Sequence, residues 1–571
     1  MYVLGIAHDL VISSACLIKN GKIIFAISEE RLNRIKQYKG FPRLSIEACL
    51  KYAKIKFSDL DHISIGWNPL NTMSYPSESW SKVSRNRMEY LYSIPNHLSY
   101  FKKFINNNIL EQKLYDKGPK VSYYNHQLCH AAGAFYQSGF EESAILTLDG
   151  TGERTTGLLA SAKKNKIETI SEIEYPNSLG LFYASLTQFL GFKAESDEWK
   201  VMALGAYSSK TKNPYIKKFE KFYSLDNSYN KFTLNMEYFT FPYPETNHGL
   251  FFSKNLVKLI GDPREPDSKL SKKHYSIAYA LQYHFEKIMM FFLDNLYSKY
   301  PSKNLVLSGG CIMNCKFNGE IKKKTKFDNI YIPSAPDDSG ISVGCSMLTY
   351  ANSIKFNNKN LSKIISNYWG SSYSNTKVSN LLNSYKLNYR KSKNLSDEIS
   401  ELLINNKLIG WFQGRSEFGQ RSLGNRSILA DPRKKNIKDI VNKSIKFREK
   451  FRPFAPAILD YCFKDFFETD GEREINFMEK TKNFKKNKIN LVKGVVHQDG
   501  SGRVQTVSKN YNKKFYELIQ AFFKKTSIPI LLNTSFNLNG EPIVETPDDA
   551  IRTFYNCGLD YLVIEDFIIS K

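Results

Sequence analysis

Three short apolar runs, each followed by a turn rich in glycine or polar residues, constrain the fold of this chain most. They are residues 2–6 before His8-Asp9, residues 143–148 before Asp149-Gly150-Thr151-Gly152-Glu153, and residues 304–308 before Gly309-Gly310. Apolar runs of this length, bounded by turn residues, are typical of buried strands. Glycine after a strand leaves backbone N–H groups accessible to a phosphate. The order of these runs predicts an α/β protein with a nucleotide site at the ends of its strands.

Two further patterns agree with an α/β fold. Residues 14–18 and 22–26 are joined by Lys19-Asn20-Gly21, and Asn-Gly in such a turn predicts a β-hairpin. Residues 275–296 carry apolar side chains at helical spacing and predict a long helix. Actin-like and sugar-kinase-like ATPases show a similar succession of strands and glycine-rich turns, arranged as two related α/β halves around a nucleotide site.

Length and composition describe an ordinary globular protein. The chain has 571 residues, of which 42% are hydrophobic and 24% charged, so we expect two to four domains. It has no uninterrupted apolar run of about 18 residues, and its start lacks the basic region and the small-residue cleavage site of a signal peptide. Its eight cysteines are scattered and form no disulfide framework. We therefore expect a cytoplasmic protein without a membrane partner, and a homodimer is possible.

The positive charge allows two interpretations. Lys and Arg number 81 against 56 Asp and Glu, which gives a net charge of +25. Such an excess can bind nucleic acid or another polyanion. It can equally reflect lysine spread over the whole surface, and the lysine-rich runs lie apart without an RNA-binding motif. We favour the second interpretation, so a nucleic-acid partner is not expected.

A change in composition marks a domain boundary. Residues 350–393 are rich in Asn, Ser and Lys and poor in core-forming residues. We expect one domain over residues 1–355, a linker region over residues 356–393 and a second α/β domain over residues 394–571.

Two histidines and two aspartates form a candidate metal site. His126 and His130 are four residues apart, on one face of an expected helix, so both imidazoles can reach one ion. Asp149 follows one predicted strand, and a second acidic turn, Asp337-Asp338, follows another. This ligand set suits a borderline divalent ion such as Fe²⁺, Mn²⁺ or Zn²⁺. A pair of histidines on a helix is also common in cores and on surfaces without a metal.

His8 lies in the turn directly after the first strand. Near neutral pH an imidazole there can act as a general base beside a nucleotide site. A packing or turn-capping role is an equally good interpretation of this histidine from the sequence.

The C-terminal part contains a dense set of cations among Gly, Ser and Pro. They occur in residues 414–433 and 442–456, and Arg503 and the polar run Asn533-Thr-Ser535-Phe-Asn537 follow. Arginine binds planar carboxyl-like and phosphate groups in two-pronged fashion, and lysine neutralises phosphoryl oxygens. A solvated basic helix would contain more Glu and fewer Gly and aromatic residues. The segment therefore predicts a site that binds phosphates and forms an anhydride.

The succession of these motifs resembles the O-carbamoyltransferases of antibiotic and nodulation-factor biosynthesis. The resemblance extends from Gly5 to near Ile569, and its C-terminal motifs are the most specific. The motifs are, in order, HD, EERxxRxK, HxxxHAA, LDGTGE, ExKVMAL, SGGxxxN, PDDSG, GRxEFGxRSLGNRSI, KxRExFRPFAP, DGSxRxQTV and LLNTSFNxxGEPIV.

The resemblance implies two coupled active sites. The N-terminal domain would be actin-like, similar to the tRNA threonylcarbamoyl transferase subunit, and would contain the metal. The C-terminal domain would be YrdC-like and would make carbamoyl-adenylate from ATP and carbamoyl phosphate. The carbamoyl group would then pass to a hydroxyl of a small-molecule or carbohydrate acceptor. The implied metal is Fe²⁺, with Mn²⁺, Zn²⁺ or Mg²⁺ as alternatives.

The resemblance also implies roles for individual residues. His8 would be the base that deprotonates the acceptor. The metal ligands would be His126, His130, Asp149 and Asp338. The nucleotide pocket of the N-terminal domain would be formed by Gly150, Thr151, Gly309, Gly310 and Asn314. Carbamoyl phosphate and ATP would be bound in the C-terminal domain by Arg421, Lys446, Arg452, Arg503, Asn533 and Ser535.

Two other functions compete with carbamoyl transfer. A tRNA-modifying threonylcarbamoyl enzyme would agree with the positive charge, but the combination of DGTGE with RSLGNRSI argues against it. A non-catalytic nucleic-acid-binding protein would explain the charge and leave the glycine-rich turns and the His/Asp pairs without a role. The sequence does not identify the acceptor.

Overall fold

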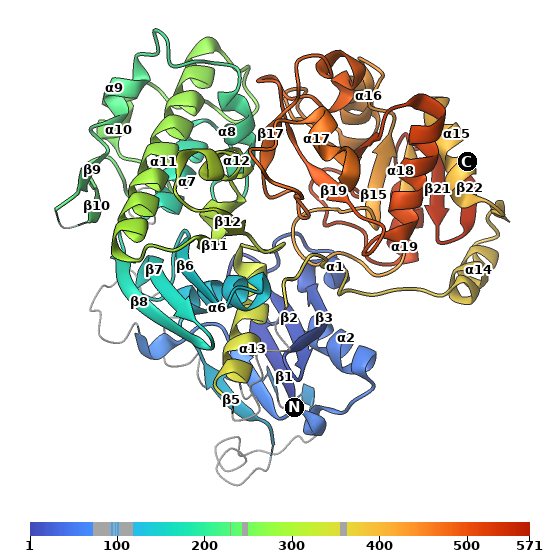
Figure 1. The fold of residues 1–571 in the computed structure, drawn as a ribbon, viewed down its shortest axis with the longest axis horizontal. Coiled ribbons are helices and arrows are strands. Elements are labelled where there is room, and N and C mark those ends of the chain that lie inside the picture. Colours follow the sequence, from blue (N-terminus) through green and yellow to red (C-terminus); the bar gives the residue numbers. More distant parts are fainter. Residues whose placement is uncertain are drawn as a thin grey trace. The chain divides into compact units, whose positions relative to one another are not determined.

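The computed structural model describes residues 1–71, 93–94, 97–98, 100–101, 118–228, 230–241, 249–353 and 362–571 (Figure 1). The chain forms two compact units, which are described separately. Unit 1 consists of Met1–Glu29, Tyr38–Asn314 and Lys324–Ile364, and unit 2 of Glu30–Gln37, Cys315–Lys323 and Ile365–Lys571. Within the ranges given above, no helix is long and apolar enough to cross a membrane.

Unit 1 contains two five-stranded sheets with the same strand order and the same strand directions. In each sheet, the first strand starts an antiparallel meander on one side and pairs in parallel with later strands on the other. The first sheet has the order β3-β2-β1-β4-β5, with β1 Tyr2–Ala7, β2 Ser14–Lys19, β3 Lys22–Ser28, β4 His62–Ile65 and β5 Lys120–Tyr123. The second has the order β8-β7-β6-β11-β12, with β6 Glu142–Leu148, β7 Thr155–Lys163, β8 Lys166–Glu174, β11 Asn304–Ser308 and β12 Asn329–Tyr331.

The predicted hairpin is confirmed. Lys19 of β2 pairs with Lys22 of β3, and both residues between them have positive φ, 50° at Asn20 and 80° at Gly21. Asn and Gly adopt these angles at low cost, which is why this pair specifies the turn.

Two buried helices lie between the sheets of unit 1. Helix α6 (His126–Ser138) packs against β6, β7 and β11, and α13 (Ile341–Ala351) packs against β1, β2 and β4. The two helices also pack against each other, and glycine permits their close approach (Figure 1). A Cβ atom on Gly344 would lie 1.9 Å from the carbonyl oxygen of Cys129. The remaining long helix of unit 1, α11 (Lys272–Lys299), covers the predicted helical pattern.

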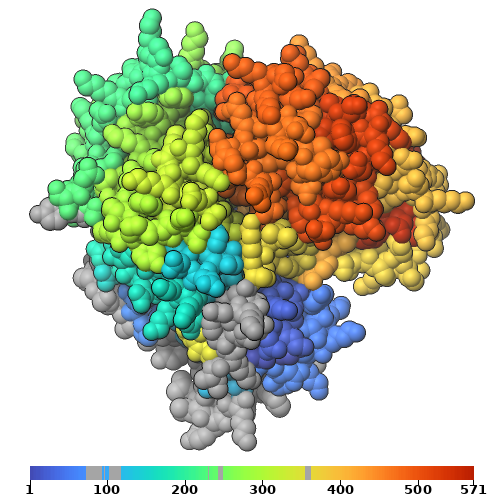
Figure 2. Space-filling view, in the orientation of Figure 1, coloured from blue at the N-terminus to red at the C-terminus, as the bar shows by residue number. Residues whose placement is uncertain are grey.

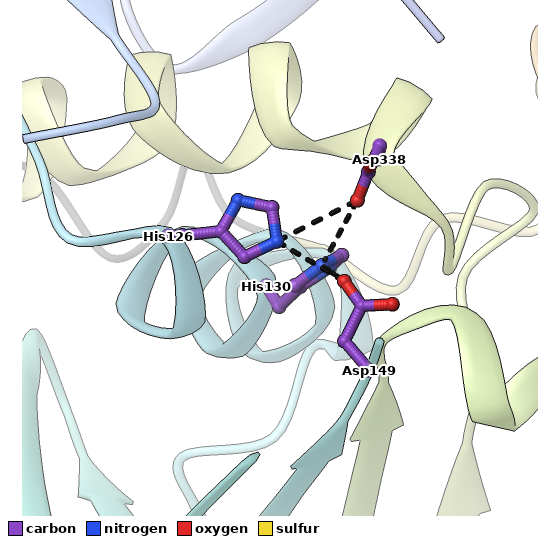
Figure 3. A group of neighbouring side chains, drawn as sticks. All are labelled: His126, His130, Asp149 and Asp338. Carbon is purple, nitrogen blue, oxygen red and sulfur yellow. Dashed lines mark hydrogen bonds and ion pairs between the residues drawn. The ribbon is translucent and has the colours of Figure 1, made fainter. Parts of the chain in front are cut away.

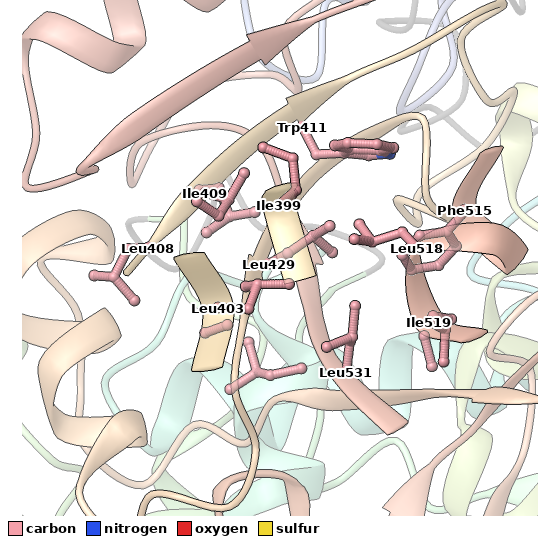
Figure 4. Packing of buried hydrophobic residues seen from close by; sticks show 14 of the residues in the cluster. Ile399, Leu403, Leu408, Ile409, Trp411, Leu429, Phe515, Leu518, Ile519 and Leu531 are labelled. Carbon is pink, nitrogen blue, oxygen red and sulfur yellow. The ribbon is translucent and has the colours of Figure 1, made fainter. Parts of the chain in front are cut away.

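Unit 2 is built on an eight-stranded mixed sheet with the order β13-β22-β21-β14-β15-β20-β16-β19. Its core includes Trp411 from the sheet and Phe515 and Leu518 from α18 (Lys513–Thr526), all buried (Figure 4). The atoms of residues after 362, yellow to red, form one continuous surface in Figure 2. The strands are β13 Tyr389–Lys391, β14 Ile409–Phe412, β15 Arg426–Ala430, β16 Ala455–Leu459, β19 Gln505–Val507, β20 Ile530–Ser535, β21 Tyr561–Ile564 and β22 Phe567–Ser570.

The stretch expected to be a linker contains regular structure. Helix α14 (Asn375–Ser384) and the edge strand β13 lie within residues 362–393 and belong to unit 2. Val378 and Leu382 are one helical turn apart and fully buried, and they pack this otherwise polar helix against the core of unit 2. Residues 354–361 lie outside the described ranges.

The substitution Gly344→Ala should destabilise unit 1, because its Cβ cannot be placed without separating α13 from α6. We expect a loss of about 1–3 kcal/mol, typical of overpacking, measured as a lower urea midpoint. Gly133→Ala is the matched control in the same helix contact, since its Cβ would approach no atom closer than 3.4 Å. Equal losses for the two variants would contradict the packing described here.

Candidate functional site

Four side chains of unit 1 converge where α6, the end of β6 and the turn before α13 meet (Figure 3). Nε2 of His126 and Nε2 of His130 lie 3.1 and 3.0 Å from Oδ2 of Asp149. The same two nitrogens lie 3.5 and 3.7 Å from Oδ1 of Asp338. One potential ligand atom from each of the four residues lies within 4.8 Å of the others, a spacing that a single metal ion can bridge.

Each aspartate of this cluster uses its two oxygens differently. Oδ1 of Asp149 accepts the backbone N–H groups of Gly150 at 2.7 Å and Gly310 at 3.2 Å. Oδ2 of Asp338 accepts the N–H of Val11 at 2.9 Å. The remaining oxygen of each carboxylate therefore points at the imidazoles, which fixes the ligand orientation before any ion binds.

The second nitrogen of His130 also has a partner. Its Nδ1 lies 3.4 Å from Oγ of Ser308, at the end of β11. The ring of His126 packs edge-on against Trp67, with 5.4 Å between ring centroids. These contacts hold both imidazoles with Nε2 directed at the aspartates.

The histidines and aspartates of the cluster shift one another's pKa values. Burial alone lowers the pKa of His130, but hydrogen bonds and charge from Asp149 and Asp338 outweigh it and raise this pKa to about 9. Burial raises the pKa of Asp149, but the two histidines outweigh that effect and hold it well below its usual range. Two imidazoles and two carboxylates therefore fit a borderline divalent cation such as Fe²⁺, Mn²⁺ or Zn²⁺.

Metal affinity should fall as the pH falls. Below pH 9 His130 of the metal-free protein holds a proton, which the metal must displace. The apparent affinity for Mn²⁺ or Zn²⁺ should therefore weaken about tenfold for each unit of pH below 9. Competition with a chromophoric chelator between about pH 6.5 and about pH 8.5 measures this slope. The control variant His274→Asn, away from the cluster, should show the same dependence of metal affinity on pH. An affinity that does not change with pH in the unaltered protein would contradict the assignment of these four residues as a metal site.

His8 lies in the loop after β1 and is 2% exposed. Its Nδ1 lies 3.4 Å from Oδ2 of Asp9, and its ring packs edge-on against Phe41. The same loop supplies the N–H of Val11 to the metal-ligand candidate Asp338. A second imidazole, that of His97, stacks on Phe41 with 4.5 Å between centroids. No motif in the sequence surrounds His97, so its place beside His8 could not be predicted.

Two of the three glycines expected to bind nucleotide contact one carboxylate. Gly150 and Gly310 donate to Asp149, and Gly309 has a φ of 94° with no room for a Cβ beside the carbonyl of Leu148. Thr151 follows Gly150 in the same turn. Asn314 instead forms two amide hydrogen bonds with Gln282 of α11, at 2.9 and 3.1 Å.

In unit 2, Lys446 is buried on a π-helical turn, Asn442–Lys446. Its Nζ contacts the carbonyl oxygen of Ser535 at 2.5 Å and its hydroxyl at 3.2 Å. It also contacts the carbonyl oxygen and Oδ1 of Asn537, at 3.0 and 2.8 Å. Burial, followed by repulsion from Arg448, Arg452 and Lys36, holds the pKa of Lys446 well below its usual range.

The arginines of unit 2 form a group of like charges. Burial, followed by Arg452 and Arg503, lowers the pKa of Arg448 well below its usual range, and burial lowers that of Arg503. Glu449, 3.2 Å from Arg452, offsets part of the charge. Arg452 is buried and Arg448 and Arg503 are half-buried, and such a group of cations favours an anionic ligand.

The other two expected residues of unit 2 lie as follows. Asn533 donates to the carbonyl of Ser422 at 3.2 Å and to Oε1 of Gln505 at 3.0 Å. Arg421 is half-buried and directly precedes Ser422 in the chain. The structure thus places Asn533 beside the segment that carries Arg421.

Three residues of unit 2 that lie at this group of charges were not among the expected site residues, namely Lys36, Arg448 and Asn537. Arg448 and Asn537 lie two residues after Lys446 and Ser535, inside the same motifs, so their position in the motifs could have indicated that they belong to the site. Lys36 comes from the N-terminal end of the sequence, and only the folded chain reveals that it belongs to unit 2.

Comparison with known proteins matches both ends of the chain to one family. The model of the carbamoyltransferase N-terminus matches residues 2–347, and that of the carbamoyltransferase C-terminus matches residues 400–571. The chain is 35% identical to the nodulation protein NolNO of Sinorhizobium fredii, over 99% of this chain and 79% of that protein. It is 32% identical to an uncharacterized protein of Synechocystis sp., over 100% of this chain and 97% of that protein.

Among solved structures, the chain is similar to component A of the Acidaminococcus fermentans (R)-2-hydroxyglutaryl-CoA dehydratase. The TM-score is 0.32 and the identity 14%, over 62% of this chain and 100% of that chain.

Proposed function

The chain belongs to the carbamoyltransferase family and is a carbamoyltransferase, and we propose that it is an ATP-dependent O-carbamoyltransferase. In this proposal unit 2 makes carbamoyl-adenylate from carbamoyl phosphate and ATP. Unit 1 passes the carbamoyl group to a hydroxyl of a small-molecule or carbohydrate acceptor. The observation that carries the proposal is that one chain contains both a four-residue candidate metal site, in unit 1, and a group of cationic side chains, in unit 2.

The cation cluster suits the first half-reaction. Carbamoyl phosphate, water and ATP would give phosphate, pyrophosphate and carbamoyl-adenylate, as a carbamate oxygen forms a bond to the α-phosphorus and pyrophosphate leaves. Apart from water, the reactants and products are all anionic, and Lys446, Arg448, Arg452 and Arg503 would bind their phosphates. Activation is needed because nitrogen donates electrons into the carbamoyl carbonyl and makes it a poor electrophile.

The second half-reaction is assigned to unit 1. His8 would accept the proton of the acceptor hydroxyl while that oxygen attacks the carbamoyl carbon, and AMP would leave with the electrons of the broken C–O bond. The N–H groups of Gly150 and Gly310 bind Asp149 and that of Gly309 binds the carbonyl of Pro336, so these glycine turns would contribute close approach of the backbone to the nucleotide. A divalent ion held by His126, His130, Asp149 and Asp338 would supply Lewis-acid charge at this phosphate.

The architecture supports the same division. We propose that unit 1 has an actin-like fold, because its two sheets repeat one strand order, as expected for two related halves. We propose that the mixed sheet of unit 2 is YrdC-like. Whether the acceptor is a sugar or another metabolite is left open by this proposal.

Pyrophosphate release tests the first half-reaction without an acceptor. ATP with carbamoyl phosphate should release pyrophosphate, and Arg452→Ala should lower the rate by about 10²-fold, because it removes a buried phosphate-binding cation. Lys450→Ala, an exposed cation two residues away, is the matched control and should retain the rate. Pyrophosphate release that does not depend on carbamoyl phosphate, or an equal loss of rate in the two variants, would contradict the proposal.

His8→Asn should separate the two half-reactions. Pyrophosphate release should stay within about twofold of the unaltered protein, while carbamoyl transfer to any acceptor that this protein uses should fall by about 10²–10⁴-fold. Asp9→Asn, which removes the carboxylate 3.4 Å from Nδ1, should give a smaller loss of transfer. Parallel loss of both activities in His8→Asn would rule out the role of His8 as the transfer base.

A further inference from the structure

Glu153, the last residue of the DGTGE turn, is a buried carboxylate bound to the first turn of the helix that carries both histidines. It is 1% exposed. Its two oxygens accept the backbone N–H of His126 at 3.0 and 3.1 Å. They also accept the N–H of Asn68 at 2.8 Å and the side-chain amide of Asn125 at 3.2 Å.

These contacts fix the start of α6. His126 is the first residue of the helix, so its N–H has no partner within the helix. A carboxylate there satisfies this donor and interacts favourably with the helix dipole. Oε1 of the neighbouring Gln127 accepts a hydrogen bond from the hydroxyl of Thr147 in β6 at 2.6 Å. This bond links the first turn of α6 to strand β6.

The turn that contains Glu153 also contains the ligand candidate on the opposite side of the cluster. Asp149 is four residues before Glu153 in the chain, and both follow β6. One short turn therefore supplies a carboxylate to the cluster and holds the backbone of the histidine that faces it. The separation between Nε2 of His126 and Oδ2 of Asp149 depends on this turn.

We propose that Glu153 is a positioning residue of the metal site, which sets the distance between His126 and Asp149 through its hydrogen bonds to the start of α6. Among the residues that the structure describes, its hydrogen-bond partners are two backbone N–H groups and one side-chain amide. The inference rests on the proposed metal site and does not involve the chemistry of transfer.

The test is the affinity of the full-length protein for Co²⁺, measured by chelator competition, with the visible absorption of the bound ion as a second readout. Glu153→Gln should weaken Co²⁺ binding by about 10–100-fold and change the absorption bands, because the ligand geometry relaxes. The matched control Glu142→Gln, at the exposed start of β6, should leave the Co²⁺ affinity and the absorption bands unchanged. Unfolding in excess chelator measures the purely structural effect of each variant.

The possible outcomes separate this inference from the proposal on which it depends. Equal affinity and equal spectra for Glu153→Gln and the unaltered protein would overturn the positioning role alone. No stoichiometric binding by the unaltered protein would overturn the metal site and the inference with it. If Glu153→Gln does not fold, Glu153→Asp replaces it in the test. Its shorter side chain should weaken Co²⁺ binding at least about threefold. Unchanged affinity in this variant would overturn the role.

Discussion

The close packing of α6 against α13 is the constraint on which the metal cluster depends. Helix α6 carries His126 and His130, and the turn that leads into α13 carries Asp338. Helices usually pack with their axes 8–10 Å apart, and the side chains at the contact determine the value. With Gly344 against the carbonyl of Cys129, this pair packs backbone to backbone. A larger residue at the contact would move Asp338 away from His126 and His130.

The two units gather opposite charges. Unit 1 brings Asp149 and Asp338 to two imidazoles, and unit 2 collects the buried Lys446 and Arg452 and the half-buried Arg448 and Arg503, with Glu449 as a partial counter-charge. Burial of like charges is unfavourable unless a ligand neutralises them. A ligand that binds only the folded state adds its binding free energy to stability. We therefore interpret both clusters as sites whose stability depends on the ligands that they select.

The sequence allowed parts of this arrangement to be predicted, because they depend on local spacing. The i, i+4 histidines indicate one helix face, and Asp149 at the end of an apolar run is placed at a strand end. Asn20-Gly21 specifies its own hairpin. Asp338 was assigned its role by resemblance, since no local pattern links it to a helix more than 200 residues earlier. The contact between Val11 and Asp338, the link from Glu153 to α6 and the docking of α14 depend on tertiary packing, which spacing alone does not reveal.

Unit 2 contains a segment from the N-terminal end of the sequence, Glu30–Gln37. Arg34 of this segment donates to the carbonyls of Pro542 and Ile543 at 2.8 and 2.6 Å, across a sequence separation of 508 and 509 residues. At about 5–20 residues per second, a ribosome needs roughly half a minute to two minutes to synthesise the intervening chain. Throughout that time Arg34 has been made and its partners have not. Arg34 is thus synthesised long before its native partners, and this part of unit 2 can be completed only after residues 542 and 543 have been made.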